Sequence, residues 1–406
     1  MPPTSPSRAE PRTEPEAPTR PPLSAPRASP ARRATVFVLF NIGAVLLLLL
    51  VLEGAASIYY AFRDAFATPP VAESLHTEYD PELGWINLPN VYLPNMYGPG
   101  KYLRTNSQRF RNNADFPAIV PPGKARIICS GDSFTFGYGV DNDHTWPQLL
   151  ATRAPTLETV NMGQGGYGAD QAYLWYKRDG VPLDHDIQIL AIILPDLYRM
   201  QHKAFNGYGK PVLTLDNDRL VTANVPVPRS MQVRSPRLVR VETAVFNLNL
   251  TRMLRRVLKL DTAAPASETQ KERNQETAWV VTSMLDDLRE TNRSRRSVLV
   301  LVYLPTREEY GADPGASWRK FLANYAQQHG VPYFDLAEDF RRLPAGALDK
   351  LFIGTGTMNF PGAAGHYTDA GNALVADLIY RKLLASPVTA AKLHAQASDA
   401  ASASEK

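Results

Sequence analysis

The apolar residues of this 406-residue chain form one long run and several short ones. The long run covers residues 34–52, none of which carries a charge. The short runs have the length of buried strands and are bounded by polar or turn-forming residues. They cover residues 126–129, 159–161, 187–194, 298–304 and 331–334. They predict the strands of a buried sheet, with 159–161 the shortest candidate.

Between and after these runs the apolar spacing changes to that of helices. Two sets of apolar residues recur at three- and four-residue intervals: Trp318, Phe321, Leu322 and Tyr325, then Ala370, Ala373, Leu374 and Leu378. Such intervals place the side chains on one face of a helix. Strands that alternate with amphipathic helices predict a parallel sheet covered on both faces. We therefore expect an α/β protein.

The long apolar run has the dimensions of a membrane span. At ~1.5 Å per residue, residues 34–52 would reach roughly 28 Å, close to the ~30 Å hydrocarbon core of a bilayer. The sequence predicts a transmembrane helix over residues 34–62, so that the lipid bilayer is a partner. Residues 1–33 contain ten prolines and are expected to form a disordered tail.

The charges on the two flanks predict the orientation of this span. Residues 14–33 hold four arginines, whereas residues 63–82 hold one, Arg63. The positive-inside rule therefore predicts a cytoplasmic N-terminus and a single-pass protein whose main domain lies in the periplasm or outside the cell. A cleaved signal peptide with its small-residue site at residues 65–67 is the alternative, and it exports the domain as well.

The charge balance and the cysteine content exclude two classes of protein. The formal net charge is +4, and residues 1–33, with six arginines and three glutamates, contribute +3 of it. The rest of the chain is nearly neutral, which argues against nucleic-acid binding. The single cysteine, Cys129, excludes an intramolecular disulfide framework and a cysteine-based zinc cluster. We expect no metal.

The pattern predicts four segments beyond the span. Residues 63–120 form a stem and N-terminal extension, residues 121–386 the α/β domain, residues 200–272 an insertion within it, and residues 387–406 a flexible tail. The insertion contains a basic stretch, residues 229–259, with seven arginines and one lysine against one glutamate. This stretch is either a lid that contacts anionic lipid or an acidic glycan, or, as we prefer, a helix packed on the domain with solvated arginines.

A candidate nucleophile follows the first predicted strand of the sheet. The loop Gly131-Asp132-Ser133 lies where parallel sheets collect reactive groups, beyond the carboxyl end of a strand. A serine nucleophile needs a base, and histidine is suited to this role at neutral pH. Of the seven histidines, His366 alone lies in a loop that leads directly into the last amphipathic helix. We expect Ser133 and His366 to meet.

Three motifs together resemble those of the SGNH, or GDSL-type, hydrolases. They are Gly131-Asp132-Ser133, residues 161–168 after the next strand, and the late Gly365-His366 pair. The resemblance spans residues 125–384 and implies a flavodoxin-like three-layer α/β/α sandwich without a cofactor. It also implies that Ser133 is the nucleophile and His366 its base. The N–H groups of Ser133 and Gly166 would form the oxyanion hole.

Two blocks depart from the family pattern. Pro195 stands where the family has an oxyanion-hole asparagine, and Ala363 stands where it has the aspartate that orients the histidine. Proline has no donor, and alanine has no carboxylate. Asp196 and Asp349 are the candidate replacements for the orienting acid. Asp369 is expected to cap the last helix.

The glycines at 163, 165 and 168 also match the dinucleotide fingerprint. That fingerprint requires an acid at the end of the following strand, whereas Asp184 and Asp186 precede that strand. We interpret the glycines as a tight turn.

The sequence as a whole predicts a membrane-anchored esterase or O-acyltransferase that acts outside the cytoplasmic membrane. Its expected substrate, by analogy with the family, is an O-acylated carbohydrate of an envelope or secreted polysaccharide. The alternative is a catalytically silent module of the same fold that binds a glycan or a partner protein. The substitutions at Pro195 and Ala363 are the reason to consider it.

Overall fold

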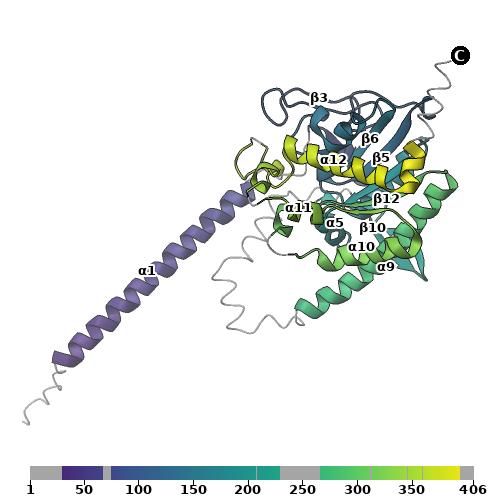
Figure 1. Ribbon diagram of the computed structural model, residues 1–406. Helices are drawn as coiled ribbons and strands as arrows, with labels where there is room; N and C mark the ends of the chain where they lie inside the picture. The colour runs from purple at the N-terminus through teal and green to yellow at the C-terminus, as the bar shows by residue number, and fades with distance from the viewer. Residues whose placement is uncertain are drawn as a thin grey trace, which may run out of the picture. The chain divides into compact units, whose positions relative to one another are not determined.

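The computed structural model describes residues 30–66, 75–206, 208–228, 266–310, 313–344, 346–358 and 360–393. The chain divides into two compact units, Met1–Tyr59 and Tyr60–Lys406. Helix α1 (Pro30–Phe66) begins in the first unit and ends in the second (Figure 1). The second unit contains the sheet and all the other helices and strands that the structure describes.

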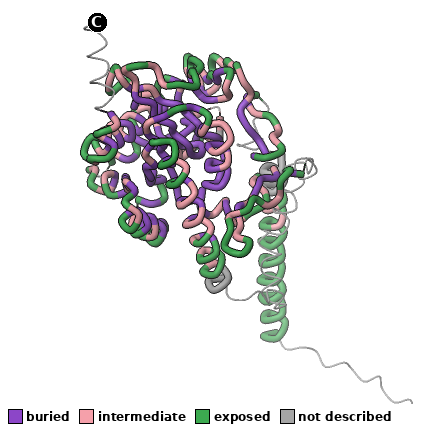
Figure 2. The backbone as a smooth tube through the Cα atoms, turned by 90° about the vertical axis from the view of Figure 1, so that its right-hand side faces the viewer, coloured by how far each residue is buried: buried purple, intermediate pink, exposed green. Residues whose placement is uncertain are grey.

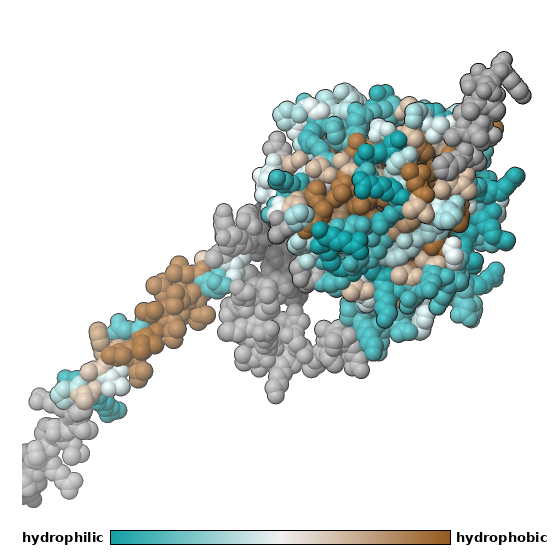
Figure 3. All heavy atoms as spheres, in the orientation of Figure 1, coloured by the Kyte–Doolittle hydropathy of each residue, from teal (hydrophilic) through white to brown (hydrophobic). Residues whose placement is uncertain are grey.

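Helix α1 contains the predicted membrane span and is longer at both ends. Its segment Pro30–Ala55 is long and apolar enough to cross a membrane, a property that a signal sequence shares. Apolar side chains cover most of its length (Figure 3) and are exposed. Residues 30–33 belong to the helix, so the tail expected over 1–33 is too long by these four residues. Residues 1–29 lie outside the described part of the chain.

Five parallel strands form the central sheet, in the order β13-β12-β7-β5-β6. Their bounds are β5 (Ala125–Gly131), β6 (Leu157–Gly163), β7 (Ile187–Ile192), β12 (Val298–Tyr303) and β13 (Tyr333–Asp335). Every pairing in this sheet is parallel. The parallel sheet expected from the short apolar runs is confirmed.

Helices cover both faces of the sheet. Alternate residues of each strand point to opposite faces, so each face carries an apolar cluster that helices bury. Ile128 contributes to one apolar cluster, and its neighbours Ile127 and Cys129 contribute to the other. The Ile128 side is covered by α4 (Ala169–Trp175), α9 (Ala266–Ser294) and α10 (Ala316–His329). The opposite side is covered by α3 (Trp146–Ala151), α11 (Ala337–Arg341) and α12 (Asp369–Ala385). The expected three-layer α/β/α arrangement is confirmed, and Figure 2 shows the buried residues gathered at its centre.

The N-terminal extension is part of the domain rather than a stem. Strands β1 (Thr77–Asp80) and β2 (Gly84–Asn87) form an antiparallel hairpin, and β3 (Tyr92–Leu93) pairs with β4 (Leu103–Arg104). Trp85 is buried and donates from its indole nitrogen to the Gly165 carbonyl at 2.9 Å. Tyr167 in turn donates from its hydroxyl to the Trp85 carbonyl at 2.5 Å. The extension therefore supports the glycine-rich loop after β6.

The insertion and the C-terminal tail also differ from the expectation. Between residues 204 and 223 the insertion forms strands β8 (Ala204–Phe205), β9 (Tyr208–Gly209), β10 (Val212–Asp216) and β11 (Arg219–Ala223). Residues 266–272, assigned to the insertion, belong to α9. The basic stretch 229–259 lies outside the described residues. Residues 387–393, expected to be flexible, are helical and bury Leu393 against the apolar cluster beneath α12.

A buried ion pair connects the insertion to the domain. Lys210, between β9 and β10, places its Nζ 2.5 Å from Asp170 Oδ2 in α4, and neither side chain is exposed to solvent. The ammonium also donates to the Pro211 carbonyl at 2.9 Å, and the carboxylate accepts the Gln171 N–H at 2.9 Å. Each charge therefore compensates the other inside the protein.

Removing one partner of this pair leaves the other charge buried without compensation. We expect Lys210→Met and Asp170→Leu each to lower the free energy of unfolding of the full-length protein by about 3–5 kcal/mol. The free energy of unfolding of the double variant should be closer to that of the wild type than the value of either single variant. Urea unfolding followed by tryptophan fluorescence measures this. Single variants that lose less than about 1 kcal/mol would contradict the compensation.

Candidate active site

Ser133 lies at the start of a short helix that follows a buried strand. Strand β5 ends at Gly131, and α2 (Ser133–Phe136) begins two residues later. The Asp132 carboxylate accepts the Phe134 N–H at 2.8 Å and so caps this helix. A Cβ at Gly131 would lie 2.3 Å from Thr135 Oγ1 and 2.8 Å from the Ala191 carbonyl oxygen. Only glycine fits this turn, which positions Ser133 at the end of the sheet.

His366 is positioned by a loop that is tied to the domain on both sides. The His366 carbonyl accepts the Ile353 N–H at 2.8 Å, and its neighbour Tyr367 forms a β-bridge with Phe352. Thr368, not Asp369, caps α12 by accepting the Gly371 N–H at 3.2 Å. The structure places His366 Nε2 2.7 Å from Ser133 Oγ. The two residues expected to meet are therefore in hydrogen-bond contact.

The environment of the His366 ring favours the neutral imidazole. The ring packs against Phe134 and Tyr138, with centroid distances of 4.5 and 5.2 Å. The pKa of His366 is lowered to about 4. Burial is the largest cause and the Arg199 charge acts in the same direction, whereas Asp132 and the backbone carbonyls at 363 and 364 raise the pKa. A neutral imidazole at physiological pH can accept the proton of Ser133.

Among the described residues, no carboxylate forms a hydrogen bond with the second nitrogen of the imidazole. His366 Nδ1 is buried, and among the described residues nothing completes a hydrogen bond to it. The carbonyls of Ala363 and Ala364 lie near enough to raise the pKa of His366. These dipoles favour a proton on Nδ1, which leaves Nε2 as the acceptor that faces Ser133.

The two orienting acids predicted from the sequence have other partners. Asp196, in α5 (Leu194–Arg199), accepts the Ile193 N–H at 3.0 Å and an Arg199 N–H at 2.6 Å. Asp349 is exposed and pairs with Arg307 at 2.8 Å. Neither carboxylate forms a hydrogen bond with His366. Pro195 lies in the first turn of α5, where backbone N–H groups have no partner within the helix, so its missing N–H costs no helical hydrogen bond.

Gly166 lies in a loop that β5 and the N-terminal extension hold in place. The Gln164 N–H donates to the Gly131 carbonyl at 3.2 Å, which fixes the loop beside the end of β5. The Gln164 side chain accepts the Gly165 N–H at 2.8 Å and donates to Asn87 Oδ1 at 2.8 Å. Gly166 itself has a φ of +75°, a conformation that favours glycine. The N–H groups of Ser133 and Gly166 donate to no acceptor within the described residues.

The glycine pattern that matches the dinucleotide fingerprint has a packing role in this fold. A Cβ at Gly163 would lie 2.1 Å from the Phe136 backbone nitrogen, so the loop can pass close to α2 only because this residue is glycine. Within the described residues no three histidine, cysteine or acidic side chains group as metal ligands.

A charged cluster that the sequence analysis missed lies directly behind the nucleophile. Arg199 Nη1 lies 3.1 Å from Asp132 Oδ2 and 2.6 Å from Asp196 Oδ1. Asp132 Oδ2 in turn lies 3.2 Å from Ser133 Oγ. Burial raises the pKa of Asp196 well above its usual range, and the adjacent Asp132 raises it further, whereas Arg199 lowers it. The three-residue spacing of Asp196 and Arg199 in one helix was the available signal for this cluster.

Solved structures that are similar to this chain have low sequence identity to it. No family model and no curated protein matches the chain. One similar solved structure is a putative lipolytic protein of the G-D-S-L family from Desulfitobacterium hafniense DCB-2, with 15% identity over 64% of this chain and 99% of that one, and a TM-score of 0.37. Another is the acetyl xylan esterase AlAXEase, with 15% identity over 63% of this chain and 98% of that one, and a TM-score of 0.34.

A third similar structure is the lipase/acylhydrolase from Enterococcus faecalis, with 12% identity over 64% of this chain and 95% of that one, and a TM-score of 0.36. This chain's own strands and helices form the parallel sheet covered on both faces that an SGNH-type fold requires. These structures come from ester-cleaving and lipolytic proteins. Since the identities and TM-scores are low, these similarities assign neither a family nor chemistry to this chain.

The lowered pKa of His366 can be measured directly. We expect the His366 imidazole to remain neutral until the pH falls to about 4. His144 is an internal control, because its hydrogen bond to Asp141 raises its pKa above 6.5. Histidine-selective NMR titration of the full-length protein distinguishes the two rings.

The same shift makes the stability of the fold depend on pH. An unfolded chain protonates histidine near pH 6.5, whereas the folded protein resists protonation of His366 down to about pH 4. Protonation of His366 therefore has no effect on the free energy of unfolding above pH 6.5, and the free energy of unfolding decreases as the pH falls from 6.5 to about 4. A His366 ring that titrates near or above 6.5 would contradict the described environment.

Proposed function

We propose that this protein is a serine-dependent acyl-ester hydrolase or O-acyltransferase. The observation that carries the proposal is the 2.7 Å contact between Ser133 Oγ and His366 Nε2 at the carboxyl end of a parallel sheet. In this proposal Ser133 attacks the ester carbonyl while His366 accepts the hydroxyl proton. The protonated His366 then gives this proton to the departing alcohol, which leaves an acyl group on Ser133.

The backbone N–H groups of Ser133 and Gly166 would bind the oxyanion that develops during the attack. Both donate to no acceptor of the described residues, and glycine at 166 permits the positive φ that its loop adopts. Removing one such donor costs ~10²–10³ in rate in other hydrolases, and Pro195 cannot supply a third. The charge of Arg199, one contact removed from Ser133 through Asp132, is suited to offset part of this loss.

Water or a sugar hydroxyl would complete the reaction. His366 removes a proton from the incoming nucleophile, which attacks the acyl group and releases Ser133. With water the products are a carboxylic acid and the free enzyme, and with a sugar hydroxyl the product is a new ester. Carbonyls at 363 and 364 would hold the imidazole in place of the family's aspartate, whose loss costs ~10⁴ in a related triad.

The proposed setting is the outer face of a cytoplasmic membrane. The arginines before α1 favour a cytoplasmic N-terminus, and the apolar helix would anchor the domain close to the envelope. An O-acylated carbohydrate of an envelope or secreted polysaccharide is the substrate that we propose. Acetyl xylan is what the name of one structural neighbour gives as that protein's substrate.

A silent binding module remains the second candidate. The observation that favours it is His366 Nδ1, which is buried with no hydrogen-bond partner among the described residues. An imidazole that is not held in one orientation is a weaker base. The two candidates differ in whether Ser133 reacts.

A fluorophosphonate probe tests that difference. We expect the full-length protein to be labelled, because the probe reacts with activated serines, and Ser133→Ala and His366→Ala to abolish labelling. Ser130→Ala is the matched control, since Ser130 is a buried serine of β5 whose hydroxyl donates to the Ile189 carbonyl in the neighbouring strand β7. An unlabelled wild-type protein, or labelling that persists in Ser133→Ala, would rule out the enzyme.

The pH profile of the labelling rate tests the base. Because His366 has a pKa of about 4, the rate should stay constant above about pH 5 and fall below it, rather than fall near pH 6.5. Arg199→Gln removes a charge that lowers this pKa, so its acid limb should move to higher pH, while Arg199→Lys should retain most of the wild-type position. An acid limb that does not move would exclude Arg199 from the electrostatics of the base.

A further inference from the structure

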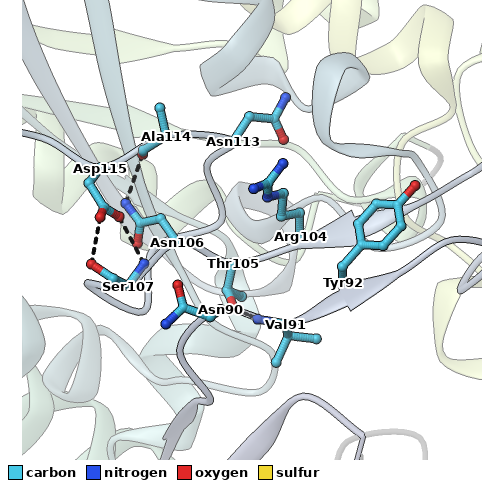
Figure 4. A pocket seen from close by; sticks show the side chains of 10 residues that line it. All are labelled: Asn90, Val91, Tyr92, Arg104, Thr105, Asn106, Ser107, Asn113, Ala114 and Asp115. Atoms are coloured by element: carbon cyan, nitrogen blue, oxygen red, sulfur yellow. Dashed lines mark hydrogen bonds between the residues drawn. The ribbon is translucent and has the colours of Figure 1, made fainter.

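A second pocket lies in the N-terminal extension, outside the residues that surround Ser133. It is formed by β3, β4 and the loop after β4, and it has a volume of about 480 Å³. Figure 4 shows its lining, which includes Asn90, Tyr92, Arg104, Asn106, Ser107 and Asp115. We call it the Arg104 pocket.

The floor of the Arg104 pocket is held rigidly by its own hydrogen bonds. Asn106 accepts the Phe110 N–H at 2.9 Å and donates to the Ala114 carbonyl at 2.9 Å. Asp115 accepts both the N–H and the hydroxyl of Ser107, at 2.8 and 2.7 Å (Figure 4). Since Asn106 and Asp115 already have partners, the floor is preorganised and its one carboxylate is largely satisfied.

Other groups at the rim have no such partners. The Arg104 guanidinium forms no hydrogen bond or ion pair with any residue that the structure describes, and the same holds for the Asn90 side-chain amide. Tyr92 is 60% exposed, although its ring lies beside that of Tyr102, 5.8 Å away between centroids. Figure 4 shows Arg104 and Tyr92 on one side of the pocket and Asp115 with Ser107 on the other.

These groups define the chemistry of a ligand. A guanidinium pairs with a carboxylate through two parallel hydrogen bonds. An exposed tyrosine ring offers a flat apolar surface with a polar edge, which suits the C–H face of a sugar ring. The side-chain amide of Asn90 can bind a hydroxyl group, whereas that of Asn113 already donates to Tyr102 and Asp143. We propose that the Arg104 pocket binds an acidic saccharide unit, a sugar that carries a carboxylate.

The Arg104 pocket is fixed to the element that carries Ser133. The Arg104 N–H donates to Asn142 Oδ1 at 3.0 Å, and the buried Arg111 donates to the same oxygen at 3.0 Å. Arg111 also donates to the Phe136 carbonyl, at the end of α2, at 2.8 Å. A polysaccharide held at this pocket is therefore attached to the same rigid framework as the nucleophile. The inference adds a recognition site to the proposed function but requires no reaction at Ser133.

Calorimetric titration of the full-length Ser133→Ala protein tests the proposal. The probes are tetragalacturonate and the uncharged cellotetraose, which has the same number of sugar units. We expect tetragalacturonate to bind and cellotetraose to bind at least tenfold more weakly, and the difference should shrink as salt screens the charge. Arg104→Gln should weaken tetragalacturonate binding at least tenfold, with Arg104→Lys between the two because lysine pairs as a point charge.

Arg219→Gln is the matched control, because Arg219 is an exposed arginine on a different hairpin. Arg219→Gln should leave tetragalacturonate binding unchanged. Because Arg104 and Arg219 are both exposed, substitution of either one should not change the midpoint of unfolding. Absence of tetragalacturonate binding, equal binding of the two probes, or unchanged binding in Arg104→Gln would each overturn the proposal. Fluorophosphonate labelling of Ser133 is measured separately on the wild-type protein. If the protein is labelled but does not bind tetragalacturonate, only the pocket proposal is refuted. If it binds tetragalacturonate but is not labelled, only the proposed enzyme is refuted.

Discussion

The hydrogen bond between Ser133 and His366 joins residues that are 233 positions apart in the chain. Neither residue alone is suited to attack an ester, because a serine hydroxyl is a weak nucleophile without a base. The fold creates the contact by ending β5 at Gly131 and by tying the His366 loop to residues 352 and 353. The proposed ester chemistry depends on this contact, and the parallel sheet provides the rigid support for it.

Two further parts of the chain support the site. The N-terminal hairpin supports the Gly166 loop through Trp85, and α5 supplies Arg199 behind Asp132. Low solvent exposure of Ser133 and its acidic neighbours makes each charge in the cluster more effective than it would be in water. The same burial lowers the pKa of His366. The site therefore holds a neutral imidazole against the nucleophile although no described carboxylate orients it.

The sequence predicted the strands whose apolar residues run without interruption, namely β5, β7 and β12. It underestimated β6, because this strand is buried yet contains two polar side chains. The Thr159 hydroxyl donates to the Pro147 carbonyl, and the Asn161 amide donates to the Phe136 carbonyl and accepts the Gly163 N–H. Periodicity detects apolar burial, and it does not detect polar residues that are buried with partners. It also placed residues 266–272 in the insertion, although they are the first turns of α9.

The sequence predicted the site residues that belong to a recognisable motif. It did not predict the residues that reach the site only through the folding of distant segments. Ser133, Gly166 and His366 came from three short motifs, and the structure brings Ser133 and His366 into contact. Asp196 and Asp349 were proposed from residue type alone, which contains no information about distance. The role of the N-terminal hairpin was missed for a related reason, since its strands are only four residues long and their partners lie about eighty positions away.

A crystal structure of the full-length protein after reaction with a phosphonate ester tests the central claim most directly. The account predicts a covalent bond from phosphorus to Ser133 Oγ and a phosphonyl oxygen that accepts from the Ser133 and Gly166 N–H groups. His366 Nε2 should lie within hydrogen-bond distance of the adduct. An adduct on a different residue, or a phosphonyl oxygen turned away from both N–H groups, would contradict the assignment of nucleophile and oxyanion hole.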